Sequence, residues 1–221
     1  MTRYQFDLAD PSDDRGIRRL MADTPMHGDV TLAFEREPNY FLGNQVLGPT
    51  RQTIVCRDRT RGAIVGVATR STRALWVDGQ CQRIGYLGGL RFAAEARGVG
   101  LLARGFRYLK RLHELDANAP EYYLTTIASG NETAKRVLTS GRAGLPTYHP
   151  LGVLNTLVIP NPPGRRARHS AATNRVGGVI TQTLSQQSTT RHWHALLVEC
   201  GREKQFFPCY DESDFESESG T

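Results

Sequence analysis

No apolar run in this chain approaches the roughly 20 residues that a membrane-spanning helix needs. The N-terminus also lacks the apolar core of a secretory signal, because it is mixed in character and turns acidic by residue 14. With 39% hydrophobic and 23% charged residues, the 221-residue chain has the composition of a globular protein. We therefore expect a cytoplasmic protein with no membrane partner.

Cysteine is scarce, and the spacing of the few cysteines excludes the common metal sites. The four residues are Cys56, Cys81, Cys200 and Cys209. They form no CxxC motif and no Cys/His pair at metal-ligand spacing. His192 and His194 flank Trp193 in what we take to be a strand, but two histidines alone make a poor metal site. The sequence therefore predicts no metal site.

A long basic run is also missing, although the formal net charge is +6. The densest cluster is residues 165–168, which lies in a stretch rich in Pro, Gly and Asn and is better explained as a solvated linker. A dedicated nucleic-acid arm would concentrate its charge, so nucleic acid is not an expected partner. The positive balance does favour anionic ligands, and nucleotide cofactors are among them.

The hydrophobic pattern predicts an α/β fold with a mixed, mostly antiparallel sheet flanked by helices. Asp78-Gly79 is a strong hairpin signal because both residues tolerate positive φ. Parallel pairing is expected only near the middle of the domain. The expected helices are a segment that follows residues 10–13 and ends near Met21, then 98–112 and 131–140, with a shorter irregular piece at 34–42. The expected strands are 4–9, 53–56, 63–69, 74–77, 81–87, 122–128, 145–149 and 153–159.

The hydrophobic pattern of helices and strands weakens after residue 160, and this change suggests that the chain is divided there. We expect one domain over residues 1–160 and a linker-like segment over 161–192, where large apolar residues are few. Residues 193–221 form a C-terminal segment, with strand character at 195–199 and 205–210 before an acidic tail. About sixty residues of this kind are too few and too polar to form an independent core. We therefore expect these strands to pack on the main domain or on a partner, or to be the start of a second, incomplete domain.

The stretch that carries chemistry follows a double glycine, Gly88-Gly89, which suggests a bulge in a strand. An amphipathic helix then opens on Arg97-Gly98-Val99-Gly100. The first N–H groups of a helix have no intrahelical partner, and the helix dipole is positive at this end. Glycines let a ligand approach the backbone, and an arginine suits phosphate oxygens. This turn is therefore a candidate phosphate site.

Two other interpretations compete with it. Residues 98–103 fit the G-x-G-x-x-G/A dinucleotide fingerprint, and Asp116 lies near the spacing of its ribose-binding acid. In that motif, however, the first glycine follows the strand almost at once, whereas residues 93–97 intervene here. The antiparallel meander upstream also belongs to a different fold. The glycines could alternatively serve only a tight strand-to-helix turn, and Asn131 only a helix cap.

A further interpretation is a resemblance. Arg97-Gly-Val-Gly100-Leu-Leu looks like the R-x-x-G-x-G/A acyl-CoA signature of the GNAT N-acetyltransferases, and Asn131-Glu-Thr-Ala134 resembles the N-x-x-A helix start of that superfamily. The resemblance covers about three-quarters of the chain and implies that acetyl-CoA donates an acetyl group to an amine. It implies cofactor contacts from Leu90, Phe92, Arg97, Gly98, Val99, Gly100, Leu101, Leu102, Asn131 and Ala134.

Two positions depart from the family pattern. The last small residue of the signature is Leu102, and the frequent tyrosine acid of the family is replaced by Leu138. We expect Tyr148 to be the general acid instead, because Ser140 points well away from the face of Leu138 on a helix. Leu138 also leaves open a non-catalytic acyl-CoA-binding module, or half of a tandem assembly. The identity of the amine cannot be read from these residues.

Overall fold

The computed structural model describes residues 2–26, 31, 33–43, 47–97, 99–142, 144–155, 175–176, 179–180 and 186–215. Its main sheet has the strand order β1-β2-β3-β4-β5, with β8 paired to β3. The strands of this sheet are β1 (Tyr4–Leu8), β2 (Thr50–Asp58), β3 (Ala63–Val77), β4 (Gln80–Phe92), β5 (Tyr123–Leu124) and β8 (Phe207–Pro208). A separate pair consists of β6 (Arg175–Val176) and β7 (Val179–Ile180). The helices are α1 (Asp14–Ala22), α2 (Tyr40–Gly43), α3 (Val99–Glu114), α4 (Glu132–Leu138) and α5 (Gln186–Arg202).

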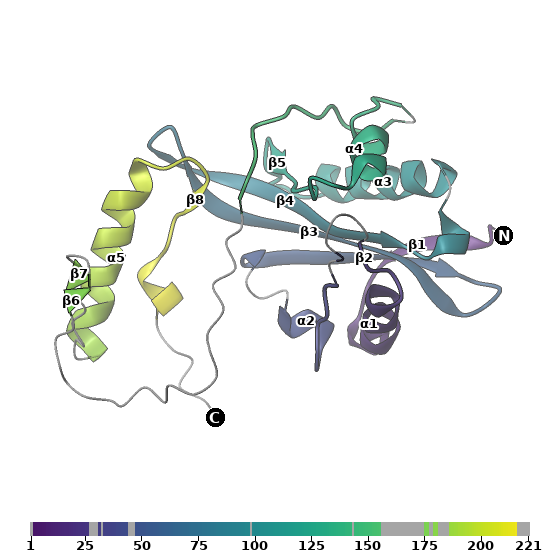
Figure 1. Ribbon diagram of the computed structural model, residues 1–221, viewed down its shortest axis with the longest axis horizontal. Coiled ribbons are helices and arrows are strands. Elements are labelled where there is room, and N and C mark those ends of the chain that lie inside the picture. The colour runs from purple at the N-terminus through teal and green to yellow at the C-terminus, as the bar shows by residue number, and fades with distance from the viewer. Residues whose placement is uncertain are drawn as a thin grey trace.

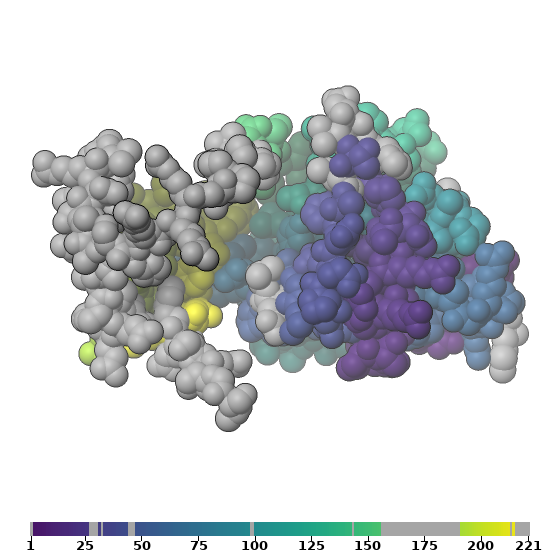
Figure 2. Space-filling view, turned by 60° about the horizontal axis from the view of Figure 1, so that its bottom comes forward, coloured from purple at the N-terminus to yellow at the C-terminus, as the bar shows by residue number. Residues whose placement is uncertain are grey.

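The sheet is mixed and mostly antiparallel, as the sequence predicts. Only β4 and β5 pair in parallel among the described strands of this sheet. Helices α1 and α2 lie on one face, and α3 and α4 lie on the other (Figure 1). Figure 2 brings the α1–α2 side forward, and the atoms of the N-terminal segments, in purple and blue, cover part of this side. Within the described ranges, no helix has both the length and the apolar content of a membrane span.

Two apolar clusters attach the helices to the sheet. On the α1 face, Ile17 and Leu20 pack against Val55 and Val67 of the sheet. On the α3 face, Leu101 packs with Cys56 and other sheet residues. The consecutive residues Val55 and Cys56 of β2 therefore serve opposite layers, as the period of two in a strand requires.

Strands β3 and β4 form one long hairpin. The expected strands 63–69 and 74–77 are continuous as β3, and the turn uses Asp78 and Gly79, both at positive φ. The register of the pair shifts between Val67 and Thr69, where β4 contains one extra residue. Gly89 lies in this bulge at a φ of 67°, a conformation that glycine adopts without strain. The predicted bulge at the double glycine is confirmed.

A buried arginine joins four elements near the middle of the sheet. Arg70 of β3 is only 1% exposed. Its guanidinium pairs with Asp116, just after α3, at 2.6 Å. It also donates to the hydroxyl of Tyr123 on β5 at 2.8 Å and to Gln52 on β2 at 2.7 Å. The hydroxyl of Tyr123 is in turn 3.0 Å from Nδ1 of His113 on α3. Arg70 thus fixes the end of α3 and the start of β5 against the sheet.

A glycine makes this contact sterically feasible. Gly85 of β4 pairs directly with Tyr123 of β5. A Cβ at Gly85 would lie 2.3 Å from the Tyr123 ring, which real structures essentially never show. The absence of a side chain at this position lets the Tyr123 ring cross β4 and reach Arg70 on the next strand.

The C-terminal segment contacts the far end of the same hairpin. Strand β8 pairs with Leu75 and Trp76, beyond Thr72, where the pairing of β3 with β2 stops. The Trp76 ring also packs closely on Gly201 of α5. The expected strand at 195–199 is wrong, because these residues belong to α5. His192 and His194 consequently lie on a helix, where Nε2 of His194 lies 3.0 Å from the backbone oxygen of Tyr210.

Three other expected strands need correction. The expected strand 122–128 is reduced to the two residues of β5, because its pairing with β4 stops at Leu124, just before the bulge in β4. Residues 144–155 contain no strand, so the strand expected at 145–149 is wrong. The strand expected at 153–159 is wrong for residues 153–155, and its remainder lies outside the described residues.

We predict that Asp116→Ala lowers the free energy of unfolding by about 3 kcal/mol. The reason is that the variant leaves the guanidinium of Arg70 buried without a counter-charge. Urea denaturation at pH 7 measures the change. The pKa of Asp116 is lowered, chiefly by its hydrogen bond from Arg70. This carboxylate therefore contributes stability above the ordinary aspartate pKa of about 4, and the contribution is lost as pH falls.

The double variant Arg70→Met, Asp116→Ala serves as the control. It removes both charges and should recover part of the lost stability. Equal stability of the single variant and the parent protein at pH 7 would contradict the assigned role of the pair. The assigned role would also be contradicted if the difference in free energy of unfolding between Asp116→Ala and the parent were the same at pH 3 as at pH 7.

Candidate functional site

The site begins where β4 and β5 separate. The two strands pair at only two positions, which end at Tyr86 and Leu124. The hydroxyl of Thr125 then donates to the backbone oxygen of Leu87 at 2.7 Å. Beyond this bridge, the edge of β4 that faces β5 has no strand partner in the described part of the chain. Apart from the oxygens of Leu90 and Phe92, which accept from Arg91 and Arg97, backbone groups along this edge are therefore available to a ligand.

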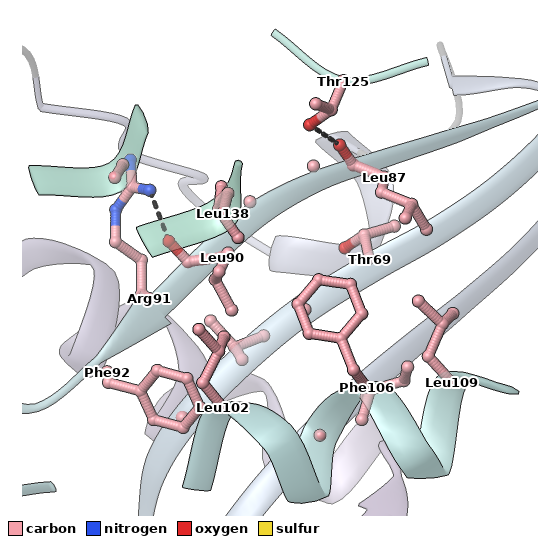
Figure 3. Close-up of a pocket in the computed structure, with 18 of the residues that line it drawn as sticks. Thr69, Leu87, Leu90, Arg91, Phe92, Leu102, Phe106, Leu109, Thr125 and Leu138 are labelled. Carbon is pink, nitrogen blue, oxygen red and sulfur yellow. Dashed lines mark hydrogen bonds between the residues drawn. The ribbon is translucent and has the colours of Figure 1, made fainter. Parts of the chain in front are cut away.

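A cavity of about 160 Å³ lies beside this split (Figure 3). One wall is the bulged part of β4, and another is the segment that follows β5. Phe106 and Leu109 of α3 point toward it, and their i, i+3 spacing places them on one face of the helix. The volume is smaller than the 300 Å³ or more of typical ligand pockets, so it suits an extended arm better than a whole nucleotide. Residues from α3, α4 and their flanks that line it include Leu102, Gly105, Phe106, Leu109, Asn131, Ala134, Leu138 and Tyr148.

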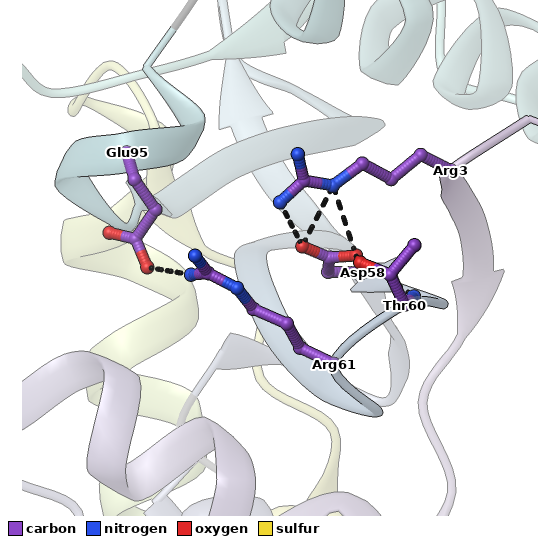
Figure 4. A network of polar contacts seen from close by, with 5 residues as sticks. All are labelled: Arg3, Asp58, Thr60, Arg61 and Glu95. Carbon is purple, nitrogen blue, oxygen red and sulfur yellow. Dashed lines mark hydrogen bonds and ion pairs between the residues drawn. The ribbon is translucent and has the colours of Figure 1, made fainter.

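The start of α3 is positioned by a short connection from β4. The 3-10 turn Ala94–Ala96 follows β4 directly, and Ala96 is buried in the α3-face cluster. Glu95 pairs with Arg61 of the β2–β3 turn at 3.2 Å (Figure 4). The same turn is held by Asp58, whose carboxylate accepts hydrogen bonds from Arg3 and from Thr60. Arg3 first, and then Thr60, hold the pKa of Asp58 well below its usual range.

Five of the residues implied by the resemblance meet at the cavity, together with Tyr148, the expected general acid. They are Leu90, Phe92, Leu102, Asn131, Ala134 and Tyr148. Figure 3 shows Leu102 beside Phe92, with its side chain directed from α3 toward the sheet. A glycine or alanine at this position would leave that space open. Leu102 therefore narrows the cavity at the end nearest the start of α3.

The remaining implied residues have other positions. Arg97 is exposed, and its Nε donates to the backbone oxygen of Phe92 at 3.3 Å. Leu101 is buried in the core and does not border the cavity. Val99 is the first residue of α3, and Gly98 lies outside the described residues.

Gly100 is the most informative residue of the turn. A Cβ at this position would meet no described atom within 4 Å, and the φ of Gly100 lies outside the left-handed region. Neither packing nor backbone conformation therefore requires glycine. Glycine in a helix is nonetheless unfavourable by about 0.5–1 kcal/mol relative to alanine. Gly100 also lies in the first turn of α3, where the backbone N–H groups lack intrahelical partners.

Asn131 caps α4, and it also borders the cavity. Its Oδ1 accepts the backbone N–H of Ala134 at 3.0 Å, which confirms the expected cap. Its Nδ2 has no hydrogen-bond partner among the described residues. The cap thus accounts for the oxygen of this amide, while the nitrogen remains available to a ligand.

Tyr148 and Leu138 also line the cavity. Leu138 is buried and brings no polar group to the site. Tyr148 is half-buried, and burial raises the pKa of its phenol. The phenol is therefore protonated at neutral pH.

The dinucleotide interpretation does not agree with this geometry. Asp116 would have to bind a ribose, but its carboxylate is paired with Arg70 and accepts the N–H of Asn118. The 3-10 turn and Arg97 also separate the end of β4 from the glycines. The two structural features on which that fingerprint depends are therefore missing.

Sequence reasoning missed several residues that border the cavity. Thr125 bridges the split, and Thr69 lies beside the bulge with its hydroxyl 3.0 Å from that of Tyr40. Arg91 follows the bulge on β4 and also borders the cavity. No local motif marks these residues, since only the register of β3 and β4 brings them together. The double glycine was the one available signal for their position.

Comparisons with known proteins identify the fold. No protein-family model and no curated protein matches the chain. Among solved structures, a putative acetyltransferase from Agrobacterium tumefaciens aligns with a TM-score of 0.50 and 12% identity, over 69% of this chain and 99% of that one. AAC(6')-Iy, in complex with the bisubstrate analogue CoA-S-monomethyl-acetylneamine, aligns with a TM-score of 0.50 and 14% identity, over 71% of this chain and 100% of its own.

A third structure, of a probable acetyltransferase, aligns with a TM-score of 0.50 and 13% identity over 72% of this chain and 99% of that one. The chain therefore has the fold of the GNAT acetyltransferases, which the two motifs predict. About three tenths of the chain lies outside each of these matches.

We predict that Gly100→Ala raises the free energy of unfolding by about 0.5–1 kcal/mol in the absence of any ligand. The added methyl enters open space, and alanine loses less backbone entropy than glycine. Gly105→Ala on the same helix is the control, because its Cβ would lie 3.1 Å from the ring of Phe6. Chemical denaturation of both variants checks this, and a destabilised Gly100→Ala would show that the fold itself needs the glycine.

Proposed function

We propose that the protein is an N-acetyltransferase that transfers an acetyl group from acetyl-CoA to a primary amine. One observation carries the proposal: the cavity at the split between β4 and β5 is bordered by Leu102 in the first turn of α3, and this turn contains Gly100, a glycine that nothing in the described chain requires. Such a glycine gives phosphate access to free N–H groups at the positive end of the helix dipole. The fold shared with acetyltransferases agrees with this interpretation.

The residues fit the two chemical parts of the donor. The pyrophosphate would be held by the first turn of α3 around Gly100, with the exposed Arg97 nearby as a positive charge. The pantetheine arm would lie in the cavity, where the free edge of β4 at Leu90 offers backbone groups. The unpartnered Nδ2 of Asn131 offers a further donor.

Bound acetyl-CoA would supply the thioester that the amine attacks. The protein contributes mainly proximity and orientation, which are large effects when two reactants share one site. Backbone N–H groups at the bulge of β4 would stabilise the oxyanion that develops during acyl transfer. Tyr148, with its protonated phenol at the cavity wall, would donate the proton that the departing sulfur requires.

A non-catalytic acyl-CoA-binding module is the second candidate. The specific observation in its favour is Leu138, an apolar residue at the cavity position where the family often has a tyrosine. Such a module would bind the donor through the same residues but would not turn it over. Tight binding of acetyl-CoA without transfer to any amine would support this candidate over the enzyme.

We predict that acetyl-CoA binds with a dissociation constant in the micromolar range, about −8 kcal/mol, and that NAD shows no comparable binding. Gly100→Glu should abolish binding by placing bulk and negative charge where phosphate sits. The variant should still fold, because glutamate is favourable near a helix N-terminus. Isothermal titration calorimetry measures both ligands.

Ala117→Glu is the matched control for this binding experiment. It adds the same charge at an exposed site beyond the other end of α3 and should leave the affinity unchanged. Binding of NAD in preference to acetyl-CoA would end the acetyltransferase proposal. Unchanged acetyl-CoA affinity in Gly100→Glu would remove the phosphate site from the start of α3.

We predict that Tyr148→Phe lowers kcat by at least about tenfold on an amine substrate and leaves acetyl-CoA affinity nearly unchanged. A positioned general acid typically contributes about 10²- to 10⁴-fold to the rate. Stability should change little, because the hydroxyl has no partner among the described residues. Tyr122→Phe is the control, since Tyr122 is exposed and outside the cavity. Unchanged kcat in Tyr148→Phe would remove this residue from the mechanism.

A further inference from the structure

Arg91 is a half-buried cation without a counter-charge in the described part of the chain. Each of Arg3, Arg18, Arg57 and Arg70 has its pKa raised by at least one carboxylate. The pKa of Arg91 is instead lowered by burial, and no described carboxylate offsets the effect. Leaving a charge partly desolvated and unpaired is unfavourable for folding. An arginine in this position calls for an explanation other than stability.

The strand register places Arg91 on the α1 side of the sheet. It pairs directly with Val67 of β3, and directly paired residues of antiparallel strands project from the same face. Val67 packs among residues of α1, and the guanidinium lies over the ring of Phe34 at 5.8 Å. The start of α3 and the helix α4 lie on the opposite face (Figure 1).

The cavity connects these two sides. It is bordered by α4 residues such as Ala134 and also by Arg91 and by Met26, which follows α1. The donor-binding features of the proposed function belong to the α3–α4 side. An acceptor that meets the donor at the bulge of β4 would therefore approach from the side of Arg91.

The guanidinium is also available to a ligand. Its one described hydrogen bond goes to the backbone oxygen of Leu90 at 2.8 Å (Figure 3). A guanidinium carries five N–H donors, so most of them remain for a planar or tetrahedral oxyanion. Its contact with the edge of β4 holds it within one residue of the bulge.

We propose that Arg91 selects the acceptor, and that the acceptor is an amine that also carries an anionic oxygen group, either a carboxylate or a phosphate. This inference rests on the proposed function, because it specifies the second substrate of the same site. Binding of the anion supplies the counter-charge that the fold omits. The ion pair also directs the amine toward the bulge of β4.

The test measures acetylation of paired amines that differ in one anionic group. L-methionine is compared with L-methioninamide, phosphoethanolamine is compared with ethanolamine, and spermidine serves as a cationic amine. We expect kcat/KM to be at least about tenfold higher for one or both anionic members than for their neutral partners. The two pairs also distinguish a carboxylate from a phosphate as the recognised group.

Variants of Arg91 then separate recognition from structure. Arg91→Met should raise KM for the preferred anionic amine at least about tenfold, remove the preference and leave acetyl-CoA affinity unchanged. Its melting temperature should not fall, since the lost charge has no described partner, whereas a structural ion pair would give a fall. Arg91→Lys keeps the charge and should restore part of the preference. Arg19→Gln removes an exposed charge from α1 and should change nothing.

The outcomes distinguish a failure of the role assigned to Arg91 from a failure of the proposed function. Neutral or cationic amines acetylated as well as the anionic ones would overturn the role of Arg91 and leave the proposed function standing. A preference that survives in Arg91→Met would overturn it as well. Acetylation of none of these amines, with acetyl-CoA bound, would favour the non-catalytic module and would remove the acceptor assignment with the proposed function.

Discussion

The buried guanidinium of Arg70 is the constraint on which the site depends. Strand β5 pairs with β4 at only two positions, too few to hold a strand in place by its ladder alone. Arg70 supplies the missing restraint by bonding Tyr123 of β5 and Asp116 at the end of α3. The position of β5 beside β4 is therefore fixed, while the chain after β5 is free to diverge from β4. The same ion pair fixes the chain just after α3, and so helps to place the helix whose Leu102, Phe106 and Leu109 line the cavity.

The bulge in β4 determines the other side of the opening. With Gly89 in a left-handed conformation, β4 gains one residue relative to β3 and bends away from β5. A fixed β5 and a bent β4 leave a gap, and Thr125 marks the point at which pairing stops. The cavity thus arises from two local features of the backbone. Its apolar lining comes from α3, which packs Phe106 and Leu109 toward the same gap.

The sequence predicted the features that depend on local chemistry. The hairpin at Asp78-Gly79, the bulge, the Asn131 cap and the face of α3 all follow from residue type and periodicity. Features that depend on distant partners were beyond its reach. Residues 195–199 have the apolar character of a strand, but they fold as part of α5, which lies on Trp76. Nothing near Arg70 in the sequence indicates that Asp116 is its partner, and the division of the chain at residue 160 stays a prediction.

Two glycines and two arginines illustrate the difference between a residue that the fold requires and one that it does not. Gly85 and Gly100 are both glycines near the split, but the space beside Gly85 is filled by Tyr123, whereas the space beside Gly100 is filled by no described atom. Arg70 and Arg91 are both desolvated cations, but Arg70 has Asp116 and Arg91 has no described carboxylate. The fold explains the first member of each pair completely. The fold does not explain the second member, and our proposals assign each one to an anion, at the start of α3 and on the α1 side of β4. Two anionic groups on opposite sides of one bulge are what a donor with a pyrophosphate and an acidic amine acceptor would bring.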